Sequence, residues 1–347
     1  MRTRMCADRG QRIRAHGADW RVALTVLAVL LSFGAAQSPS PERKQEEPRA
    51  DRGVLAVLRR DGIMFPFASF RGSYWTAPWP GGLRNVELPI NLGSIPGRWW
   101  GGRAPDSWQA WLLDGTNRPL RAVVPAQFRV HCALRLGVRT DYKPSDPVPV
   151  LPSEPFPKDG LAVSTGIPVE PIEIVKQTDA EWGVLAVALL DEFDRVEDAE
   201  IRAVANVSQW NHPFKREERR KQPVRIESWY RTAVEENVVA SYIEAVRSYP
   251  PRPEDEGCGL ETLIGGWIYH IDGKLSDRIA LGARLTYCDR VNAAYMLPLG
   301  RIRVRDRLYW ISQLSGHESE WYSVTELSRT RAKAVLEYFA GSHLSCR

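Results

Sequence analysis

The sequence lacks the short motifs that mark nucleotide-binding sites and common hydrolytic sites. It has no GxxxxGK or GxGxxG loop for phosphates, no GxSxG turn for a nucleophilic serine, and no HExxH or HxH pair for a catalytic metal. We therefore expect no nucleotide, no metal ion and no cofactor. The sequence motifs leave the catalytic residues of any enzymatic activity unknown.

Cysteine is also scarce, with five residues in a chain of 347. Cys132, Cys258, Cys288 and Cys346 follow residue 37, and their wide spacing excludes a zinc knuckle. In an oxidising compartment four cysteines predict disulfides, in one of three full pairings. We favour Cys258 with Cys288, because both flank strands that we expect to be neighbours. The alternative is that some are small buried apolar residues.

Long apolar runs are missing as well. The run from Val22 to Phe33 has about a dozen residues, whereas a spanning helix needs roughly 20. Arginines precede this run and small residues follow it, so residues 1–37 have the layout of a secretory signal peptide, with cleavage after Ala36. We expect a secreted or periplasmic protein with no membrane span after cleavage. A permanent N-terminal membrane anchor is the alternative.

Removing the leader also removes most of the positive charge. The leader holds six arginines and two aspartates, which leaves 41 basic and 40 acidic residues in the mature chain. A near-neutral chain has no large positive field to attract phosphates, so nucleic acid is an unfavoured partner. The basic run 215–221 is interrupted by Glu217 and Glu218, and we interpret it as a solvated helix face or loop.

Changes in composition divide the mature chain into segments with different expected structures. Residues 38–52 are polar and charged and predict a disordered tether. Residues 144–172 contain eight prolines, a density that excludes a helix or an inner strand and predicts a connector. It would separate a tryptophan-rich β region, residues 53–143, from a β-rich C-terminal domain, residues 173–347, with a domain boundary near residue 150. The alternative is a connector that crosses one continuous sheet.

Turn signals predict a mainly β fold of antiparallel hairpins and meanders, with α+β as the alternative. Asp61-Gly62 lies between two apolar runs, which is a strong hairpin signal, and Asp272-Gly273 marks another turn. Apolar and polar residues alternate from Leu260 onward. Further strands are predicted over residues 107–113, 119–124, 127–138, 182–193 and 224–233.

A few helices complete the expected fold. Residues 195–205 predict a short helix, and residues 236–249 fit helix and strand equally. Residues 328–341 predict an amphipathic C-terminal helix, with Ser328 as N-cap and Gly341 after its last turn. Its apolar stripe would hold Ala332, Val335, Leu336 and Phe339.

Tryptophan is abundant, and six of the thirteen lie between residues 75 and 111. They stand among glycines and prolines, and flat rings in rigid loops suit stacking on sugars. This pattern nominates Trp75, Trp79, Trp99 and Trp100 as ligand contacts, with the pair Trp99-Trp100 the most exposed, and a glycan or cell-envelope component as partner. The alternative is that these rings cover the end of a β core.

Histidines and carboxylates give weaker signals. His270 precedes Asp272, and His317 precedes Glu318 and Glu320, although both groups are typical of solvated turns. Three function classes follow. We favour a non-catalytic binding or surface protein. A secreted hydrolase would use carboxylates from separate strands, and we nominate Asp272 and Glu320. A structural envelope protein would bury the tryptophans.

The proposed boundary near residue 150 predicts protease sensitivity. Limited digestion of the mature protein should cut between residues 143 and 172, because an extended connector is accessible to proteases. Mass spectrometry of the fragments locates the cut. A digestion pattern with no cut in this interval would contradict the two-domain division.

Overall fold

The chain folds into antiparallel hairpins, as its turn signals predict. The computed structural model describes residues 52–82, 87–144, 158–164, 166–252, 257–276, 280–288, 290, 293–316 and 319–342. Strands β1 (Arg52–Arg59) and β2 (Ile63–Arg71) form the hairpin expected around Asp61-Gly62. The Gly62 amide donates to the Arg59 carbonyl at 3.0 Å, and its φ of 77° favours glycine. The mainly antiparallel β fold is thereby confirmed.

The N-terminal sheet has eight strands. Its order is β5-β4-β8-β1-β2-β7-β6, and β3 pairs with β2. The predicted strand 127–138 is wrong as one element, because His131, with a φ of 49°, turns the chain between two paired strands. The further strands are β3 (Tyr74–Thr76), β4 (Trp108–Leu112), β5 (Asn117–Leu120), β6 (Ala122–Val130), β7 (Ala133–Thr140) and β8 (Lys158–Val163). Two short 3-10 helices, η1 (Leu92–Ser94) and η2 (Gly97–Trp100), lie between β3 and β4.

A second sheet, here called the helix-covered sheet, follows in the order β10-β11-β12-β13-β14, and β15 pairs with β13. The ambiguous segment 236–249 forms β12, because strands pair along both of its edges. Asp272 and Gly273 both have positive φ in the predicted turn between β13 and β14. The strands are β10 (Glu173–Ile174), β11 (Val224–Glu235), β12 (Val238–Ser248), β13 (Leu260–Ile271), β14 (Lys274–Leu275) and β15 (Ala280–Tyr287).

The third sheet, here called the middle sheet, has the order β19-β18-β17-β16-β9. The predicted C-terminal helix is wrong, because residues 331–342 form β19 along the edge of β18. Ser328 is no N-cap and instead donates to the Arg331 carbonyl in the β18–β19 turn. The strands are β9 (Val169–Glu170), β16 (Ala294–Val304), β17 (Arg307–Gly316), β18 (Ser319–Ser328) and β19 (Arg331–Ser342).

The predicted strand 182–193 is also wrong, because it belongs to the long helix α1 (Ala180–Ser208). The expected short helix 195–205 is its second half. Leu185, Leu189 and Phe193 recur every four residues and are buried against the helix-covered sheet. The continuous apolar run concealed this period, because Val184 and Val187 are apolar and exposed. A second helix, α2 (Arg216–Arg219), is a single turn.

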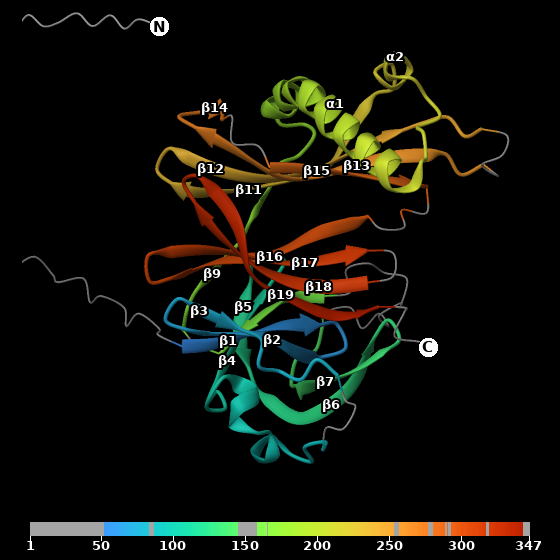
Figure 1. Ribbon diagram of the computed structural model, residues 1–347. Helices are drawn as coiled ribbons and strands as arrows, with labels where there is room; N and C mark the ends of the chain where they lie inside the picture. Colours follow the sequence, from blue (N-terminus) through green and yellow to red (C-terminus); the bar gives the residue numbers. More distant parts are fainter. Residues whose placement is uncertain are drawn as a thin grey trace, which may run out of the picture. The chain divides into compact units, whose positions relative to one another are not determined.

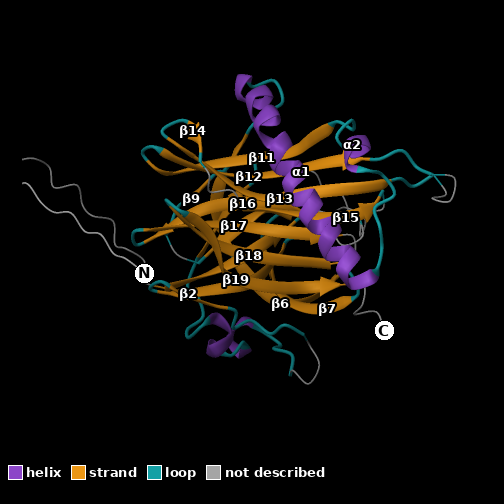
Figure 2. Ribbon diagram, turned by 45° about the horizontal axis from the view of Figure 1, so that its top comes forward, coloured by secondary structure: helices purple, strands orange, loops and turns teal. Residues whose placement is uncertain are grey.

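The three sheets and α1 stack in layers (Figure 1), and α1 lies across the strands of the helix-covered sheet (Figure 2). The middle sheet is buried on both faces. On β17, Tyr309 and Ile311 pack into a core shared with the N-terminal sheet. Leu308 and Trp310 point the other way, into a core shared with the helix-covered sheet. Alternate side chains of one strand therefore supply two cores.

Two strands lie within the proline-rich segment, and the expectation that it holds no inner strand is wrong, because residues 158–163 contain no proline and pair on both edges. β8 pairs with β1 and β4 in the N-terminal sheet, and β9 pairs with β16 in the middle sheet. Residues 47–347 form one compact unit. The predicted boundary near residue 150 lies outside the described residues, as do the predicted leader, residues 1–37, and the tether apart from Arg52.

Gly160 allows β8 to lie close to β4, and its replacement should destabilise the protein. A Cβ at Gly160 would lie 2.1 Å from the Trp111 carbonyl oxygen, a contact that requires the backbone to move. We expect Gly160→Ala to lower the free energy of unfolding by about 2 kcal/mol or more in urea denaturation. The control is Gly183→Ala in α1, where a Cβ meets no atom within 4 Å and helix propensity adds about 0.5–1 kcal/mol. Equal stability of the two variants would contradict this account.

Candidate functional site

The four nominated tryptophans are packed side chains, and none exposes more than 9% of its surface. Trp79 lies at the centre of the group, with ring centroids 4.6 Å from Trp100 and 6.0 Å from Trp99. Its indole N–H donates to the Leu136 carbonyl at 2.8 Å. The expected exposure of Trp99 and Trp100 is therefore wrong, since both rings pack on the N-terminal core. Trp100 nevertheless lines a cavity.

That cavity, here called the arginine pocket, has a volume of about 500 Å³. It opens where the start of β1 and the end of β2 meet the loop after η2. Three arginines line it together with Trp100 and serine hydroxyl groups: Arg52, Arg71, Arg103, Ser69, Ser107 and Ser164. The Trp100 indole N–H is buried and has no acceptor among the described residues. The pocket thus combines three arginines, hydroxyl groups, the Asp106 carboxylate and two aromatic residues, Phe70 and Trp100.

Two of these arginines face each other. Arg52 and Arg71 are directly paired across β1 and β2, and both are exposed. Like charges in this position repel each other and destabilise a hairpin. Arg103 is neutralised by Asp106 at 2.8 Å, whereas no ion pair between described residues involves Arg52 or Arg71. The cross-strand pairing of the two arginines depends on a register shift between Leu55 and Ala56, which the turn signal in the sequence does not reveal.

A second cavity, here called the Glu244 cavity, has a volume of about 730 Å³. Glu244 on β12, Gly265 on β13 and Gly282 on β15 are paired side by side across three strands. Residues paired in this way point to the same face of a sheet. A Cβ at Gly282 would meet no atom within 4 Å. A Cβ at Gly265 would lie 3.1 Å from the Tyr242 hydroxyl, so the open space lies at Gly282 and not directly beside Glu244.

Two polar atoms in the wall of this cavity lack partners. Glu244 is 4% exposed, and its Oε1 accepts a hydrogen bond from the Met296 amide at 2.6 Å. Its Oε2 is buried without a hydrogen bond in the described part of the chain, as is the hydroxyl of Tyr295. Both residues line the cavity. Other buried polar atoms of the described residues share this state, among them the Ser241 and Ser312 hydroxyls, but Glu244 Oε2 is the one carboxylate oxygen in this group.

Burial raises the pKa of Glu244 to about 7. The Met296 amide, the nearby Ser228 hydroxyl and Arg290 oppose this rise, whereas the negative charge of Glu227 adds to it. The removal of a carboxylate from water disfavours its charged form. Glu244 is therefore close to half ionised at neutral pH. The sequence signal was a single acid inside an apolar strand, VVASYIEAV, which the helix-strand ambiguity of that segment concealed.

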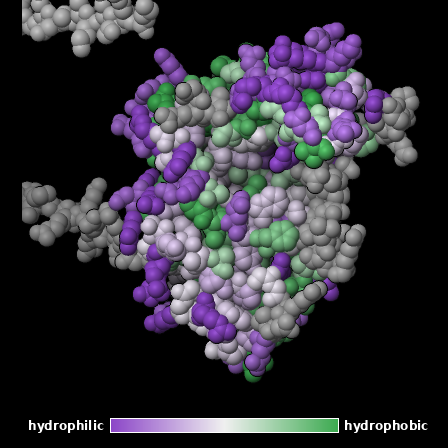
Figure 3. All heavy atoms as spheres, in the orientation of Figure 1, coloured by the Kyte–Doolittle hydropathy of each residue, from purple (hydrophilic) through white to green (hydrophobic). Residues whose placement is uncertain are grey.

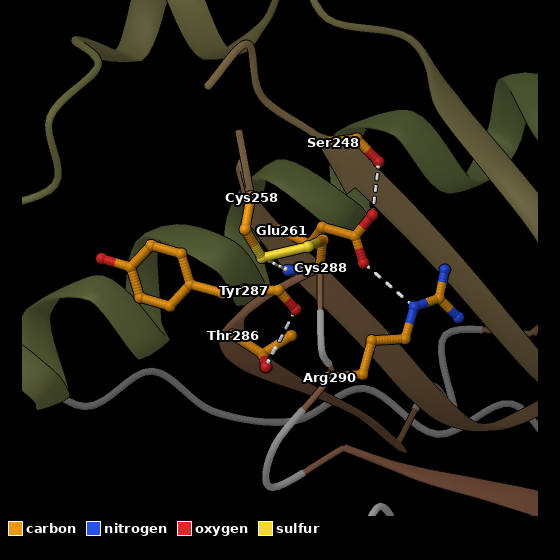
Figure 4. Close-up of a disulfide and its surroundings, with 7 residues drawn as sticks. All are labelled: Ser248, Cys258, Glu261, Thr286, Tyr287, Cys288 and Arg290. Atoms are coloured by element: carbon orange, nitrogen blue, oxygen red, sulfur yellow. Dashed lines mark hydrogen bonds and ion pairs between the residues drawn. A yellow bond between two sulfur atoms is a disulfide. The ribbon is translucent and has the colours of Figure 1, made fainter. Parts of the chain in front are cut away.

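Arg290 and a disulfide support this region (Figure 4). Cys258 and Cys288 are bonded, with Cα atoms 5.3 Å apart, which confirms the predicted pairing at the ends of the neighbouring strands β13 and β15. Arg290, two residues later, pairs with Glu227 at 2.9 Å and with Glu261 at 3.0 Å. Its guanidinium lies 5.3 Å from the centroid of the Tyr295 ring. Cys132 is also disulfide-bonded.

Another group of buried charges is fully paired. Arg247 on β12 binds Glu197 at 2.7 Å and Asp194 at 2.9 Å, both on α1. Arg219 binds Glu197 at 3.2 Å, so the interpretation of the basic run as solvated is wrong at this residue. Hydrophilic side chains gather over α1 and α2 in Figure 3. The nearby His212 is neutral, because burial and then the charge of Arg219 lower its pKa to about 4. These ion pairs fasten the helices to the sheet.

The carboxylates nominated from sequence do not meet. Asp272 lies in the β13–β14 turn, where its amide donates to the Asn237 carbonyl at 2.9 Å. Glu320 is buried on β18 of a different sheet and accepts a hydrogen bond from Tyr322. Neither lines the arginine pocket or the Glu244 cavity. His270 lies at the end of β13, and His317 and Glu318 lie outside the described residues.

Comparison with other proteins adds no assignment. No protein-family model matches the chain, and neither a curated protein nor a solved structure matches it significantly. In the described part of the chain, no cluster of three or more His, Cys, Asp or Glu side chains is placed to hold a metal ion. Among the same residues, no helix has the length and apolar character needed to cross a membrane. Functional argument therefore rests on the two cavities.

The burial of Glu244 predicts a pH-dependent stability. Its pKa is about 7 in the folded protein and near its ordinary 4.5 when unfolded, so unfolding releases a proton between these values. Stability should therefore fall by on the order of 3 kcal/mol as pH rises from about 4.5 to 7. Glu244→Gln keeps an oxygen for the Met296 amide and cannot ionise.

We expect Glu244→Gln to be more stable than the parent protein at pH 8, with the difference disappearing near pH 4.5. Urea denaturation at both pH values measures it. The control is Glu326→Gln, because Glu326 is partly exposed on β18 and pairs with Arg307 at 3.6 Å. A difference in unfolding free energy between the parent protein and Glu244→Gln that is the same at both pH values would contradict the raised pKa of Glu244.

Proposed function

We propose that the mature protein is an exported, non-catalytic binding protein that recognises an acidic saccharide in the arginine pocket. The observation that carries this proposal is the facing pair Arg52 and Arg71, which has no anionic partner among the described residues. A carboxylate bound between the two guanidinium groups would replace repulsion with two charge-assisted hydrogen bonds. An anion is thus the ligand charge that best fits the pocket.

The remaining wall supports a sugar as the body of the ligand. Ser107 and the Trp100 ring line the same pocket, and hydroxyl-rich ligands are bound by polar side chains beside an aromatic ring. Ser69 and Ser164 already bond to the backbone, through Trp100 and Val54 respectively. The volume of about 500 Å³ lies within the usual range for small-ligand pockets. Of the four nominated tryptophans, we therefore retain Trp100 as a ligand contact.

Export is part of the proposal and rests on two features. The first is the leader-like layout of residues 1–37. The second is the chemistry of the cysteines, since Cys258–Cys288 and the bonded Cys132 are typical of oxidising compartments. A partner in the cell envelope or outside the cell is consistent with an acidic glycan.

A secreted hydrolase is the second candidate, and Glu244 is the observation that favours it. A carboxyl with a pKa of about 7 suits a general acid. Glycoside hydrolysis also needs a second carboxylate across the scissile bond. The other carboxylate that lines the cavity, Glu200, is paired with Arg284 at 3.2 Å. We therefore favour a binding function over a hydrolytic one.

Acidic and neutral oligosaccharides of equal length test the proposed function. Calorimetry should detect saturable binding of galacturonic acid oligomers and at least tenfold weaker binding of neutral galactose oligomers. We expect Arg71→Gln and Arg52→Gln each to weaken acidic binding about tenfold, because each removes a charge-assisted hydrogen bond. Added salt should weaken it further.

Arg121→Gln is the matched control. The Arg121 side chain is 80% exposed and lies outside the pocket, and its guanidinium is 3.8 Å from the Asp141 carboxylate, which also accepts a hydrogen bond from the Arg121 backbone amide. Its replacement should leave binding unchanged. Equal affinity for acidic and neutral oligomers, or binding that survives loss of both Arg52 and Arg71, would refute the proposal.

A further inference from the structure

We propose that the Glu244 cavity is a second ligand site, which binds a small molecule with an apolar body and a protonated amine held by the Glu244 carboxylate. This site is separate from the arginine pocket, because the two cavities share no residue. The inference does not depend on the proposed saccharide function.

The free carboxylate oxygen indicates the head group. Glu244 Oε2 is buried in a residue that borders the cavity and has no hydrogen bond of normal geometry in the described part of the chain, although the Ser228 hydroxyl on the paired strand β11 interacts with the carboxylate. An ammonium group would supply both a donor and the opposite charge, which a buried carboxylate needs. The Tyr295 hydroxyl, also buried without a described partner, could accept a second hydrogen bond from the same group.

The protein supplies no cation of its own to this oxygen. Two arginines line the cavity, but each is already paired with a glutamate of α1. Arg195 binds Glu192 at 2.8 Å, and Arg284 binds Glu200 at 3.2 Å. Arg290 is held by Glu227 and Glu261 on the helix-covered sheet. Every described cation close to the cavity is therefore neutralised, and Glu244 remains for a ligand.

Apolar side chains form most of the remaining wall and indicate the ligand body. Leu263, Ala293 and Trp321 line the cavity on the face that carries Glu244, whereas Val196 and Ala199 of α1 line it from the opposite face of the sheet. Gly282 leaves room on the face that carries Glu244, whereas the Tyr242 hydroxyl occupies the space at Gly265. A volume of about 730 Å³ is ample for a small amphipathic molecule. An apolar body with one charged end matches both parts of the wall.

The charges around Glu244 set the pH dependence of binding. Glu227 on β11 raises its pKa, Arg290 lowers it, and the buried hydroxyls of Tyr230 and Tyr242 lie close enough to interact with it. Alkylamines stay protonated between pH 6 and 8, as lysine does. Binding should therefore strengthen about tenfold from pH 6 to pH 8, as Glu244 becomes ionised.

Calorimetry with n-alkylamines of four to eight carbons, each compared with the n-alkanol of equal length, tests the inference. At pH 8 the parent protein should bind the best amine at least tenfold more tightly than its alkanol. Glu244→Gln should abolish this preference, because it removes the charge and keeps the shape. Gly282→Leu should weaken both ligands at least tenfold by filling the cavity.

Glu326→Gln is the matched control and should behave as the parent protein, because Glu326 does not line the cavity. Circular dichroism and urea denaturation verify that each variant is folded. Amine binding that persists in Glu244→Gln at pH 8, an equal affinity for amine and alkanol, or no binding by the folded parent protein would each overturn the inference.

Discussion

Burial of the middle sheet on both of its faces is the constraint on which the rest of the structure depends. A strand inside two cores buries nearly all of its side chains. β17 does so with four apolar residues at 308–311 and with the buried polar residues Ser312, Gln313 and Ser315. One face packs on the N-terminal sheet and the other on the helix-covered sheet. The two halves of the sequence are thus joined by packing through this sheet.

The same layered packing explains where the cavities occur. The Glu244 cavity forms where glycines follow Glu244 across β13 and β15. The Tyr242 hydroxyl occupies the space at Gly265, and the space at Gly282 is open. The disulfide and Arg290 fix the ends of these strands and the Tyr295 wall. The space is therefore bordered by well-anchored strands, which favours a preformed site over one that opens on binding.

Charge pairing separates structural groups from candidate functional groups. Arg247, Glu197 and Arg219 are buried, and each meets opposite charges, as stable burial requires. Glu244 is equally buried without a cation, and Arg52 faces Arg71 without an anion among the described residues. The Glu244 carboxylate and the Arg52–Arg71 pair lie in different cavities and carry opposite charges. They are the strongest indications of ligands in the described chain.

The antiparallel β class, the hairpin turns and the Cys258–Cys288 pairing were predicted from the sequence, because they depend on local turn chemistry and on strand neighbours. The helical state of residues 182–193 and the extended state of residues 331–342 became evident from the fold alone. The spacing of apolar residues over a dozen positions does not specify which neighbouring element covers them. In the last segment, strand pairing with β18 outweighed the helical spacing of the apolar residues. The tryptophans were found from sequence, but their burial required the fold. Glu244 became a candidate only when its neighbours across the sheet proved to be glycines, since the space beside a side chain is set by residues far away in the chain.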